Sequence, residues 1–593
     1  MGRLHAARTR PKSLGNVTPS PLTEMNLNIQ GKAAHTFDAI VVGSGISGGW
    51  AAKELTEKGL KTLVLERGHD VKHIVDYKTT NSPPWELQWL NTPSREMLAQ
   101  QSKQARTGYT VRPEAGYLFV DDEDHPYEEK KRFDWMRGYH TGGRSLMWGK
   151  QSYRMSPMDF EANGKDGIAT PWPITYDEIA PWYDYVERFA GISGSKDGLE
   201  QLPDGVFQPP MDLTPPELDL KAAIEGKWKG RTLIPGRVAH LTAPTEEQLA
   251  LGRASCQYRN LCRRGCPFGA YFSSQAATLK AAANTGKMTL RPHSIVHSVI
   301  FDDKTEKAIG VRLIDEVTFE TIEYYAQVIF LNASTVASTA ILMNSKSKRF
   351  PNGMDESGSL GGNLMDHHLG VGAGATLDTH QDKIHFGRRP NGFYVPRFRN
   401  FSEKPNGNYI RGFGYQGGGM RQGWNRWIDG FGTDFKKELT SFGPWSISMG
   451  GFGECLPYDN NRISLSKDKT DKWGLPLVVA DAEFQENEIK MRGDMMNDAA
   501  EMLEAMGAKN IQTYNNPPSI GLGIHEMGTA RMGNTAKVSV LNKHNQVWGA
   551  ENVFCTDGAA MTSAGCQNPS LTYMALTARA ADFAVSEIKK GNL

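Results

Sequence analysis

Short apolar runs alternate with amphipathic stretches in the first part of the chain, a pattern typical of strands that lead into helices. Residues 37–42 (FDAIVV) form a β-branched apolar run that predicts a buried parallel strand, and the glycine-rich stretch after it opens a helical pattern. A second apolar run at 61–65 predicts the next strand and ends at Glu66. Together they predict a strand, turn, helix and strand at the start of an α/β domain.

The rest of the chain predicts a return to this first sheet and a second, different sheet. Residues 370–453 alternate glycine, aromatic and charged residues, which favours a large antiparallel sheet with a substrate face. Residues 70–131 are polar and irregular and predict a long surface excursion. Thr175 and Glu178 form a capping-box pattern for a helix from 176 that leads into a second domain. The remaining predicted elements are strands at 289–295, 309–313 and 326–331, helices at 336–343 and 486–506, and a strand and terminal helix within 538–590.

The glycine-rich stretch predicts a dinucleotide site. Gly43 allows the tight turn, Gly45 lets a pyrophosphate approach the backbone, and Gly48 lets helix and strand pack closely. The helix N-terminus supplies free N–H groups to the phosphates, and Glu66 is placed to accept the ribose hydroxyls. The fingerprint fits FAD and NAD equally.

Length, composition and charge place the chain among ordinary multidomain proteins. With 593 residues, 39% hydrophobic and 22% charged, it is too long for one core, and a net charge of +1 argues against nucleic acid or an anionic membrane as the main partner. No run of 18 apolar residues exists, so we expect no membrane span. Residues 1–24 are basic and lack an apolar core, so they do not predict a secretory signal peptide. They fit a transit peptide or, as we prefer, a disordered tail (residues 1–36), with Met25 as an alternative start.

Three of the six cysteines lie close together in the sequence. Cys256, Cys262 and Cys266 follow a C-x5-C-x3-C-P pattern, which suits an iron–sulfur cluster better than zinc, because no fourth ligand stands at paired spacing. The alternatives are three buried thiols or a disulfide. A cluster would make the protein a dehydrogenase that passes electrons on singly.

Several motifs together resemble the glucose-methanol-choline (GMC) oxidoreductase family. They are the fingerprint at 43–48, RGYHTGGRSLMWG at 137–149, GGNLMDHH at 361–368, HEMGTARMG at 525–533, NVFCTDGAAM at 552–561 and NPSLT at 568–572. The resemblance implies an α/β fold with a Rossmann-like FAD-binding domain and a substrate domain on a large, mostly antiparallel sheet, as in p-hydroxybenzoate hydroxylase. We expect the FAD-binding domain at 37–160, 254–369 and 526–593, and the substrate domain at 161–253 and 370–525.

The same resemblance implies the site residues. His525 matches the family's base toward the substrate hydroxyl, and Asn568 matches its second active-site member, which is His or Asn. A neutral imidazole can take the hydroxyl proton as hydride leaves carbon, and an amide can orient the oxygen. His140, His367, His368 and His544 stay as alternatives to His525. The expected cofactor-binding residues are Gly43, Gly45, Ser47, Gly48, Glu66, Arg67, Arg137, Gly142, Gly143, Ser145, Met147, Trp148, Gly149, Val296, Asp557, Gly558, Asn568, Ser570 and Thr572.

Two departures from the family pattern affect the cofactor. Asn332-Ala333-Ser334 stands where the family has Ala-Ala-Gly, so the packing of that turn is expected to differ. Met147 stands where pyranose oxidases, which the loop at 137–149 resembles, have a histidine bonded to flavin, so FAD should be non-covalent. The cysteine spacing resembles that of bacterial FAD-dependent glucose and gluconate dehydrogenases. It implies a 3Fe-4S cluster, a small accessory subunit that carries the export signal, and an electron-accepting cytochrome.

The expected function is therefore FAD-dependent oxidation of a secondary or anomeric hydroxyl of a sugar or glycoside. Oxidation at C3 of a glucoside is favoured. The alternatives are an oxygen-dependent pyranose or glycoside oxidase, a gluconate 2-dehydrogenase-type enzyme, and an FAD-binding scaffold without turnover. The location would be periplasmic through the partner subunit, or cytoplasmic.

Overall fold

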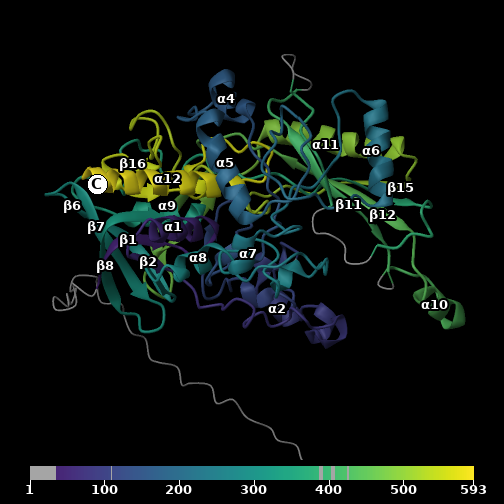
Figure 1. Ribbon diagram of the computed structural model, residues 1–593, viewed down its shortest axis with the longest axis horizontal. Helices are drawn as coiled ribbons and strands as arrows, with labels where there is room; N and C mark the ends of the chain where they lie inside the picture. The colour runs from purple at the N-terminus through teal and green to yellow at the C-terminus, as the bar shows by residue number, and fades with distance from the viewer. Residues whose placement is uncertain (1–34, 109, 386–391, 402–407, 424–425) are drawn as a thin grey trace, which may run out of the picture.

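Two separate sheets organise the molecule and lie toward opposite ends in Figure 1. The computed structural model describes residues 35–108, 110–385, 392–401, 408–423 and 426–593. The predicted tail lies outside the described residues as far as position 34, and Thr36 already belongs to the first strand.

The larger sheet has eight strands, and its central strand β1 leads into the predicted phosphate turn. β1 pairs in parallel with β2 and β8, as the opening pattern predicts, and β6 and β7 form an antiparallel hairpin at one side. Pro292 divides the predicted strand at 289–295 into β5 and β6, because proline lacks the N–H that a ladder needs. The strands of this sheet are β1 (Thr36–Val42), β2 (Thr62–Leu65), β5 (Met288–Arg291), β6 (Ser294–Asp302), β7 (Lys307–Asp315), β8 (Thr321–Leu331), β16 (Gln546–Val547) and β17 (Ala550–Cys555).

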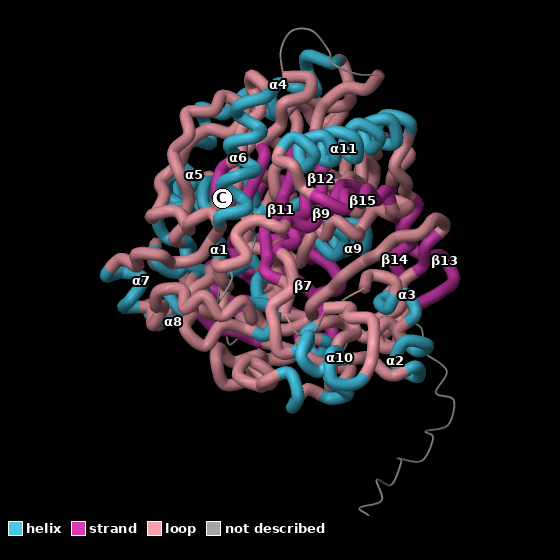
Figure 2. The backbone as a smooth tube through the Cα atoms, turned by 90° about the vertical axis from the view of Figure 1, so that its right-hand side faces the viewer, coloured by secondary structure: helices cyan, strands magenta, loops and turns pink. Residues whose placement is uncertain are grey.

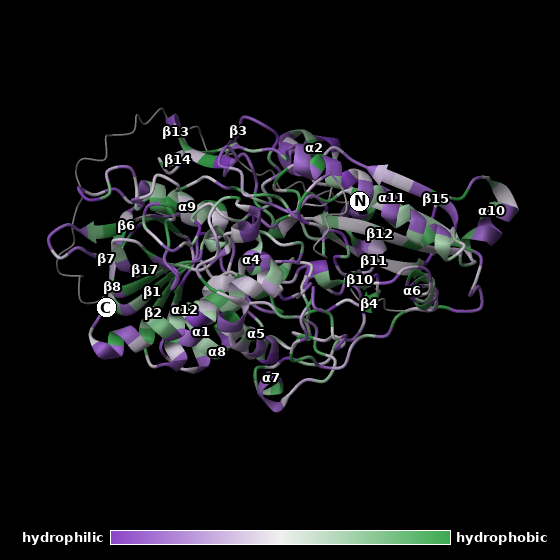
Figure 3. Cartoon of the chain, turned by 90° about the horizontal axis from the view of Figure 1, so that it is seen from above, coloured by the Kyte–Doolittle hydropathy of each residue, from purple (hydrophilic) through white to green (hydrophobic). Residues whose placement is uncertain are grey.

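Alternate residues of β1 pack into two cores on opposite faces of this sheet. Ala39 and Val41 pack with α1, α8 and α12, whereas Ile40 and Val42 share a core with α9. This is the two-residue alternation of a strand that is buried on both faces. Figure 3 shows these strands as the most hydrophobic part of the chain, with helices on both sides. The helices are α1 (Ile46–Glu57), α8 (Thr278–Asn284), α9 (Thr335–Asn344) and α12 (Ser570–Lys590).

Helix α5 (Tyr176–Ala190) begins as predicted but packs elsewhere than expected. Thr175 N–H donates to Glu178 Oε2 at 2.8 Å, which is one half of the capping box. The Tyr183 hydroxyl lies 2.8 Å from Thr572 Oγ1 of α12, and the Phe189 ring lies 5.2 Å from that of Trp50 in α1. The helix therefore adds to the helical layer of the larger sheet instead of leading away from it. The predicted domain boundaries themselves stay a prediction.

The second sheet is antiparallel throughout, as predicted for residues 370–453, and six strands form it. Helix α11 (Glu486–Ala505) lies across it, because Met491, Met495, Ala499 and Met502 form one buried stripe on the helix. Figure 2 shows α11 above the strands. The strands are β4 (Ile234–Pro235), β9 (Val371–Leu377), β10 (Phe393–Val395), β11 (Phe413–Arg421), β12 (Trp445–Gly453) and β15 (Lys509–Asn515), and α6 (Pro215–Lys227) packs beside them.

Short elements complete the described chain. The predicted excursion at 70–131 is irregular, with only short helical turns and one short strand among its described residues. A small third sheet contains β3, β13 and β14. The elements not yet given are α2 (Arg95–Gln100), α3 (Ser102–Ala105), α4 (Pro157–Asp166), α7 (Glu246–Ala250), α10 (Gly432–Leu439), β3 (Glu128–Glu129), β13 (Arg462–Thr470) and β14 (Pro476–Asp481).

We expect Gly48→Ala to destabilise the larger sheet, because an added Cβ would lie 1.9 Å from the Gly43 carbonyl oxygen. Urea denaturation should show a loss of about 1–3 kcal/mol, the usual cost of overpacking. Gly493→Ala in α11 is the control, since nothing lies within 4 Å of its added Cβ. That variant should gain up to about 1 kcal/mol from helix propensity. Equal stability of the two variants would contradict the packing role of Gly48.

Candidate active site

A single large cavity connects the phosphate turn with the second sheet. It measures about 900 Å³, and its lining runs from Gly43 and Glu66 through the loop at 135–151 to Gln416, His525 and Asn568. Residues from widely separated parts of the sequence therefore meet around one elongated space. Its size suits a dinucleotide cofactor together with a small substrate.

At the phosphate end the backbone leaves room for a ligand. Gly43 adopts a φ of +95°, and a Cβ added at Gly45 would meet nothing within 4 Å. Gly45 is the N-cap of α1, so the first N–H groups of that helix have no helical partner and are available to phosphate. The buried Ser47 Oγ has no hydrogen-bond partner in the described part of the chain. This cradle fits the pyrophosphate of FAD.

Glu66 supports the phosphate turn from the end of β2. Its carboxylate accepts hydrogen bonds from the Ser44 N–H at 3.1 Å, the Ser44 hydroxyl at 2.5 Å and the Gly68 N–H at 3.1 Å. Burial raises the pKa of Glu66, and these hydrogen bonds oppose that shift. Because Glu66 also lines the cavity, it can hold the turn and still face a ribose.

The turn after β8 keeps a glycine-like backbone without a glycine. Ser334, which stands where the family pattern has Gly, adopts φ +82° and ψ 156° at the N-cap of α9. Asn332 donates from Nδ2 to Thr556 Oγ1 at 2.6 Å, and its buried Oδ1 has no partner in the described residues. Asn332 and Ser334 both line the cavity, and Asn332 adds a polar atom to its wall.

Most of the predicted cofactor-binding residues line this cavity. Gly48, Gly142 and Thr572 do not. Gly48 packs against Gly43, Gly142 lies against the Gln275 side chain, and Thr572 bonds to Tyr183 of α5. Those that line it are Gly43, Gly45, Ser47, Glu66, Arg67, Arg137, Gly143, Ser145, Met147, Trp148, Gly149, Val296, Asp557, Gly558, Asn568 and Ser570.

His525 and Asn568 face each other across the far end of the cavity. Asn568 Nδ2 lies 3.4 Å from His525 Nε2, and the Gln416 amide donates to Asn568 Oδ1 at 2.5 Å. Gln416 belongs to β11, so the second sheet fixes which atom of Asn568 points at His525. Burial, with the nearby His367 and Arg144, holds the pKa of His525 well below its usual value, so the ring is neutral at pH 7.

The four alternative histidines lie outside the cavity lining. His140 bonds through Nδ1 to the Thr141 carbonyl, His368 packs on Phe484, and His544 stacks on Phe583 at 3.8 Å. His367 instead contacts His525 directly, with 2.8 Å between the two Nδ1 atoms. The structure therefore makes His367 a neighbour of His525.

Two buried acids hold the His525 loop in place, and neither was predicted. Asp366 accepts hydrogen bonds from the backbone N–H groups of Gly521, Gly523, His525 and His367 at 2.7–3.0 Å. Burial and the nearby Glu526 raise the pKa of Asp366, and the four N–H donors act against this shift because they bind the ionised form. Glu526 pairs with Arg144 of the 137–149 loop at 2.9 Å. Both acids stand inside the quoted motifs, but their roles depend on contacts between distant segments.

The three clustered cysteines border a smaller space of about 30 Å³, room for roughly one water molecule, and Cys262 also lines the large cavity. The Cys256 Sγ accepts a hydrogen bond from the Tyr258 N–H, and the Cys262 Sγ lies 3.7 Å from His240 Nε2. Burial raises the pKa of Cys256 to about 11 and also raises that of Cys262, so both thiols are protonated at pH 7. Among the described residues no three His, Cys, Asp or Glu side chains are arranged to hold a metal ion. The structure therefore does not support the predicted 3Fe-4S cluster.

Only a small part of the predicted substrate face at 370–453 belongs to the described cavity lining. Between residues 370 and 453 the lining includes only Gln416 and Phe452. Trp445 and Tyr415 are buried in the core of the second sheet, whereas Trp427 is 88% exposed. The aromatic residues of this region serve mainly the core.

Family models match the chain at both ends of this site. Two models described as GMC oxidoreductase match the chain. The model for the N-terminal part of the family matches residues 37–369, and the model for the C-terminal part matches residues 457–577. The chain belongs to the GMC oxidoreductase family. It is therefore a FAD-dependent oxidoreductase that acts on CH–OH groups.

Curated relatives match this GMC oxidoreductase over nearly its whole length. The 2-methyl-1,2-propanediol dehydrogenase of Mycolicibacterium austroafricanum is 27% identical over 93% of this chain and 95% of the relative. The fructose dehydrogenase large subunit of Gluconobacter japonicus is 26% identical, with 93% and 98% covered. The gluconate 2-dehydrogenase flavoprotein of Pantoea cypripedii is 26% identical, with 91% and 92% covered.

Solved structures share the fold of this GMC oxidoreductase. Pyridoxine 4-oxidase from Mesorbium loti superposes with a TM-score of 0.56 at 15% identity, covering 92% of this chain and 98% of the other. A variant of the formate oxidase from Aspergillus oryzae gives a TM-score of 0.58 at 14% identity, covering 94% and 99%. In the part of the chain that the structure describes, no helix is long and apolar enough to cross a membrane.

We expect Asp366→Asn to displace the His525 loop, because an amide offers one acceptor oxygen where the carboxylate offers two. Two backbone N–H groups would then face an NH2 group, and stability should fall by about 2 kcal/mol or more. The rate of flavin reduction should fall with it. Urea denaturation and anaerobic stopped-flow absorbance measure the two effects. Asp468→Asn, at an exposed position of β13, is the control, and an equally small effect of both changes would contradict the anchoring role.

Proposed function

We propose that this protein oxidises a secondary or anomeric hydroxyl of a sugar or glycoside, with His525 as the base. The observation that carries the proposal is the neutral His525 Nε2, which faces the Asn568 amide at 3.4 Å within the cavity. A hydroxyl oxygen that lies beside the pair on the cavity side, within hydrogen-bond reach of both nitrogens, can accept a hydrogen bond from Asn568 Nδ2 and give its proton to His525 Nε2. A non-redox scaffold would not need this pair.

When bound, FAD accepts the hydride that leaves the hydroxyl-bearing carbon. The chain's own residues then have three tasks. Asn568 holds the substrate oxygen, His525 takes the hydroxyl proton, and the C–O bond becomes a carbonyl as the C–H bond breaks. Gln416 keeps the Asn568 NH2 group turned toward the substrate by occupying its oxygen. Because the site is buried, water competes poorly for these hydrogen bonds.

The names of the relatives support a polyhydroxylated substrate. Two of the three relatives reported above are named for fructose and gluconate, and the third for a small diol. Within sugars we favour C3 of a glucoside, on the likeness of the 137–149 loop to that of pyranose oxidases. A gluconate 2-dehydrogenase-type reaction is the alternative among dehydrogenases.

The electron acceptor divides the proposal into two forms. A dehydrogenase would pass electrons to a redox protein such as a cytochrome, with a small accessory subunit, and relatives named as a large subunit and a flavoprotein favour this form. An oxidase would pass them to oxygen. No electron is routed through the cysteines in either form, and Met147 leaves FAD non-covalent.

The test is a panel of glucosides, glucose, fructose, gluconate and 2-methyl-1,2-propanediol with an artificial electron acceptor. We expect the glucosides to reduce the flavin fastest and NMR to show a 3-keto product. Reduction by the diol alone would overturn the sugar proposal. Aerobic peroxide release at the rate of turnover would favour the oxidase form.

We expect His525→Ala to retain FAD but to oxidise the sugar much more slowly. Flavin reduction should fall about 10²–10⁴-fold, the usual contribution of a general base, because no other described side chain replaces the imidazole Nε2. Anaerobic stopped-flow bleaching of the flavin band measures the rate, and absorbance after gel filtration measures FAD content. His544→Ala, a histidine stacked on Phe583 away from the cavity, is the control. An unchanged rate in His525→Ala would contradict its role as the base.

A further inference from the structure

A continuous hydrogen-bond chain leads from the cavity through His525 into the protein interior. His525 Nδ1 lies 2.8 Å from His367 Nδ1, and His367 Nε2 lies 2.9 Å from the carbonyl oxygen of Gly565. The two rings meet nearly at right angles, at 87° and 4.9 Å between centroids. His367 is buried outside the cavity lining, whereas His525 lines the cavity and is partly exposed to it.

The carbonyl at the inner end decides the proton positions along this chain. A carbonyl oxygen can only accept, so His367 Nε2 must donate to Gly565. Burial lowers the pKa of His367 to about 4, so at pH 7 its ring is neutral and its Nδ1 carries a lone pair. His525 Nδ1 must then donate to His367, which leaves a lone pair on the neutral His525 Nε2.

We propose that His367 is a positioning residue that fixes the tautomer of His525, so that the Nε2 lone pair faces the substrate hydroxyl. The inference rests on the proposed function, because it assigns His367 a task only if His525 is the base. The choice of a histidine has a second effect. A carboxylate at this position would hold the same tautomer but would raise the pKa of His525, whereas a neutral imidazole adds no negative charge.

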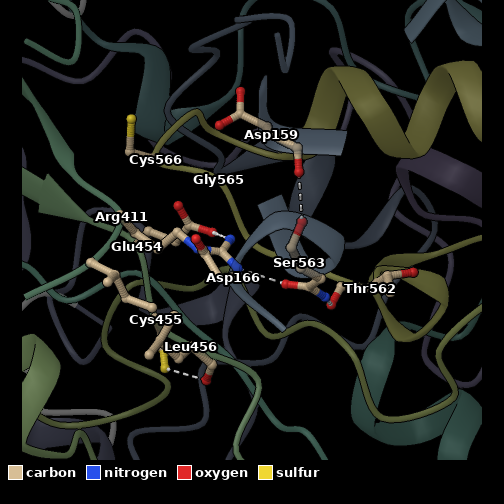
Figure 4. Close-up of polar contacts among 12 residues, drawn as sticks. Asp159, Asp166, Arg411, Glu454, Cys455, Leu456, Thr562, Ser563, Gly565 and Cys566 are labelled. Atoms are coloured by element: carbon tan, nitrogen blue, oxygen red, sulfur yellow. Dashed lines mark hydrogen bonds and ion pairs between the residues drawn. The ribbon is translucent and has the colours of Figure 1, made fainter. Parts of the chain in front are cut away.

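The surroundings of Gly565 keep the inner end of the chain rigid. Gly565 has a φ of +61°, and an added Cβ would lie 2.6 Å from Gln567 Oε1. Its backbone N–H lies near the buried Glu454 and acts to lower the pKa of that carboxyl group. Glu454 in turn pairs with Arg411 at 2.8 Å, and Arg411 pairs with Asp166 at 2.6 Å (Figure 4). Gly565 thus lies beside an ionic network in which Arg411 and Glu454 are buried, and none of its three members lines the cavity.

The ring of His367 is held from its backbone side as well. The His367 N–H donates to Asp366 Oδ1 at 2.8 Å, and the same oxygen accepts the His525 N–H at 3.0 Å. One carboxylate oxygen therefore binds the backbone N–H groups of both histidines. A hydrogen bond between the two Nδ1 atoms joins their side chains. This double connection makes a contact between the two rings persistent without any ligand.

Two substitutions at 367 separate tautomer control from packing. In His367→Asn the side-chain oxygen takes the place of Nδ1 and can still accept from His525. In His367→Leu a similar volume offers no acceptor. We expect flavin reduction by the best sugar of the panel to fall about 100-fold or more in His367→Leu, within the range of a lost general base. His367→Asn should stay within about tenfold of the native rate, and the Kd for sugar should change little in either variant.

A second readout uses the FAD-loaded enzyme without substrate. In 15N-histidine NMR spectra, assigned by the difference from His525→Gln, His525 should show a protonated Nδ1 and an unprotonated Nε2. A protonated Nε2 in the native enzyme would overturn the proposal. In His367→Leu we expect the Nδ1–H signal to be lost or to move to Nε2. His368→Leu, the neighbouring buried histidine that packs on Phe484, is the control for disruption of the segment.

The outcomes distinguish this inference from the proposed function. If His525→Ala keeps its rate, the base is wrong whatever His367 does. If His525→Ala is slow but His367→Leu and His367→Asn are equally fast or equally slow, tautomer control is wrong and the base stands. If His367→Leu loses FAD or its thermal transition, the spectrum of the native enzyme and the His367→Asn rate still decide.

Discussion

The four backbone N–H groups that Asp366 collects are the interaction on which the site depends most. They come from two segments, residues 366–367 and 521–525, that are far apart in the sequence. Asp366 is completely buried, so these donors replace the water that an exposed carboxylate would bind. Without them the loop that carries His525 would have no fixed relation to the segment that carries His367. The position of the base is therefore set by a carboxylate that the substrate never touches.

Other buried polar contacts join the parts that surround the cavity. Gln416 of β11 reaches Asn568 beside α12, Arg144 reaches Glu526, and Arg411 reaches Glu454. Burying such polar groups costs free energy unless each group has a hydrogen-bond or ionic partner. Each contact therefore favours only the arrangement in which its two partners meet. The second sheet thus orients the Asn568 amide and also forms part of the cavity wall. Apolar packing alone would fix these side chains less well, because it is not directional.

The sequence could predict those features that depend on residues close together along the chain. The apolar run of β1, the glycines at 43–48, the capping box at Thr175 and the antiparallel sheet after residue 370 all depend on neighbouring residues, and the structure shows each of them. The packing of α5 on α12 depends on long-range contacts, whereas the division at Pro292 follows from a proline that stands in the sequence itself. Spacing failed most clearly at Cys256, Cys262 and Cys266, because it predicts ligand types but not where the thiols point.

The same distinction explains why the sequence assigns His525 the role of base but gives His367 only as an alternative to it. The motif around His525 is read along the chain, but the task of His367 follows from a carbonyl about two hundred residues away that can only accept a hydrogen bond. Gly565 carries no chemistry of its own, and its importance lies in the direction of its carbonyl. A backbone oxygen in a glycine turn, which accepts from His367 Nε2, thereby determines which nitrogen of the base is free. Proton placement in this site is consequently a property of the fold, decided before any substrate enters.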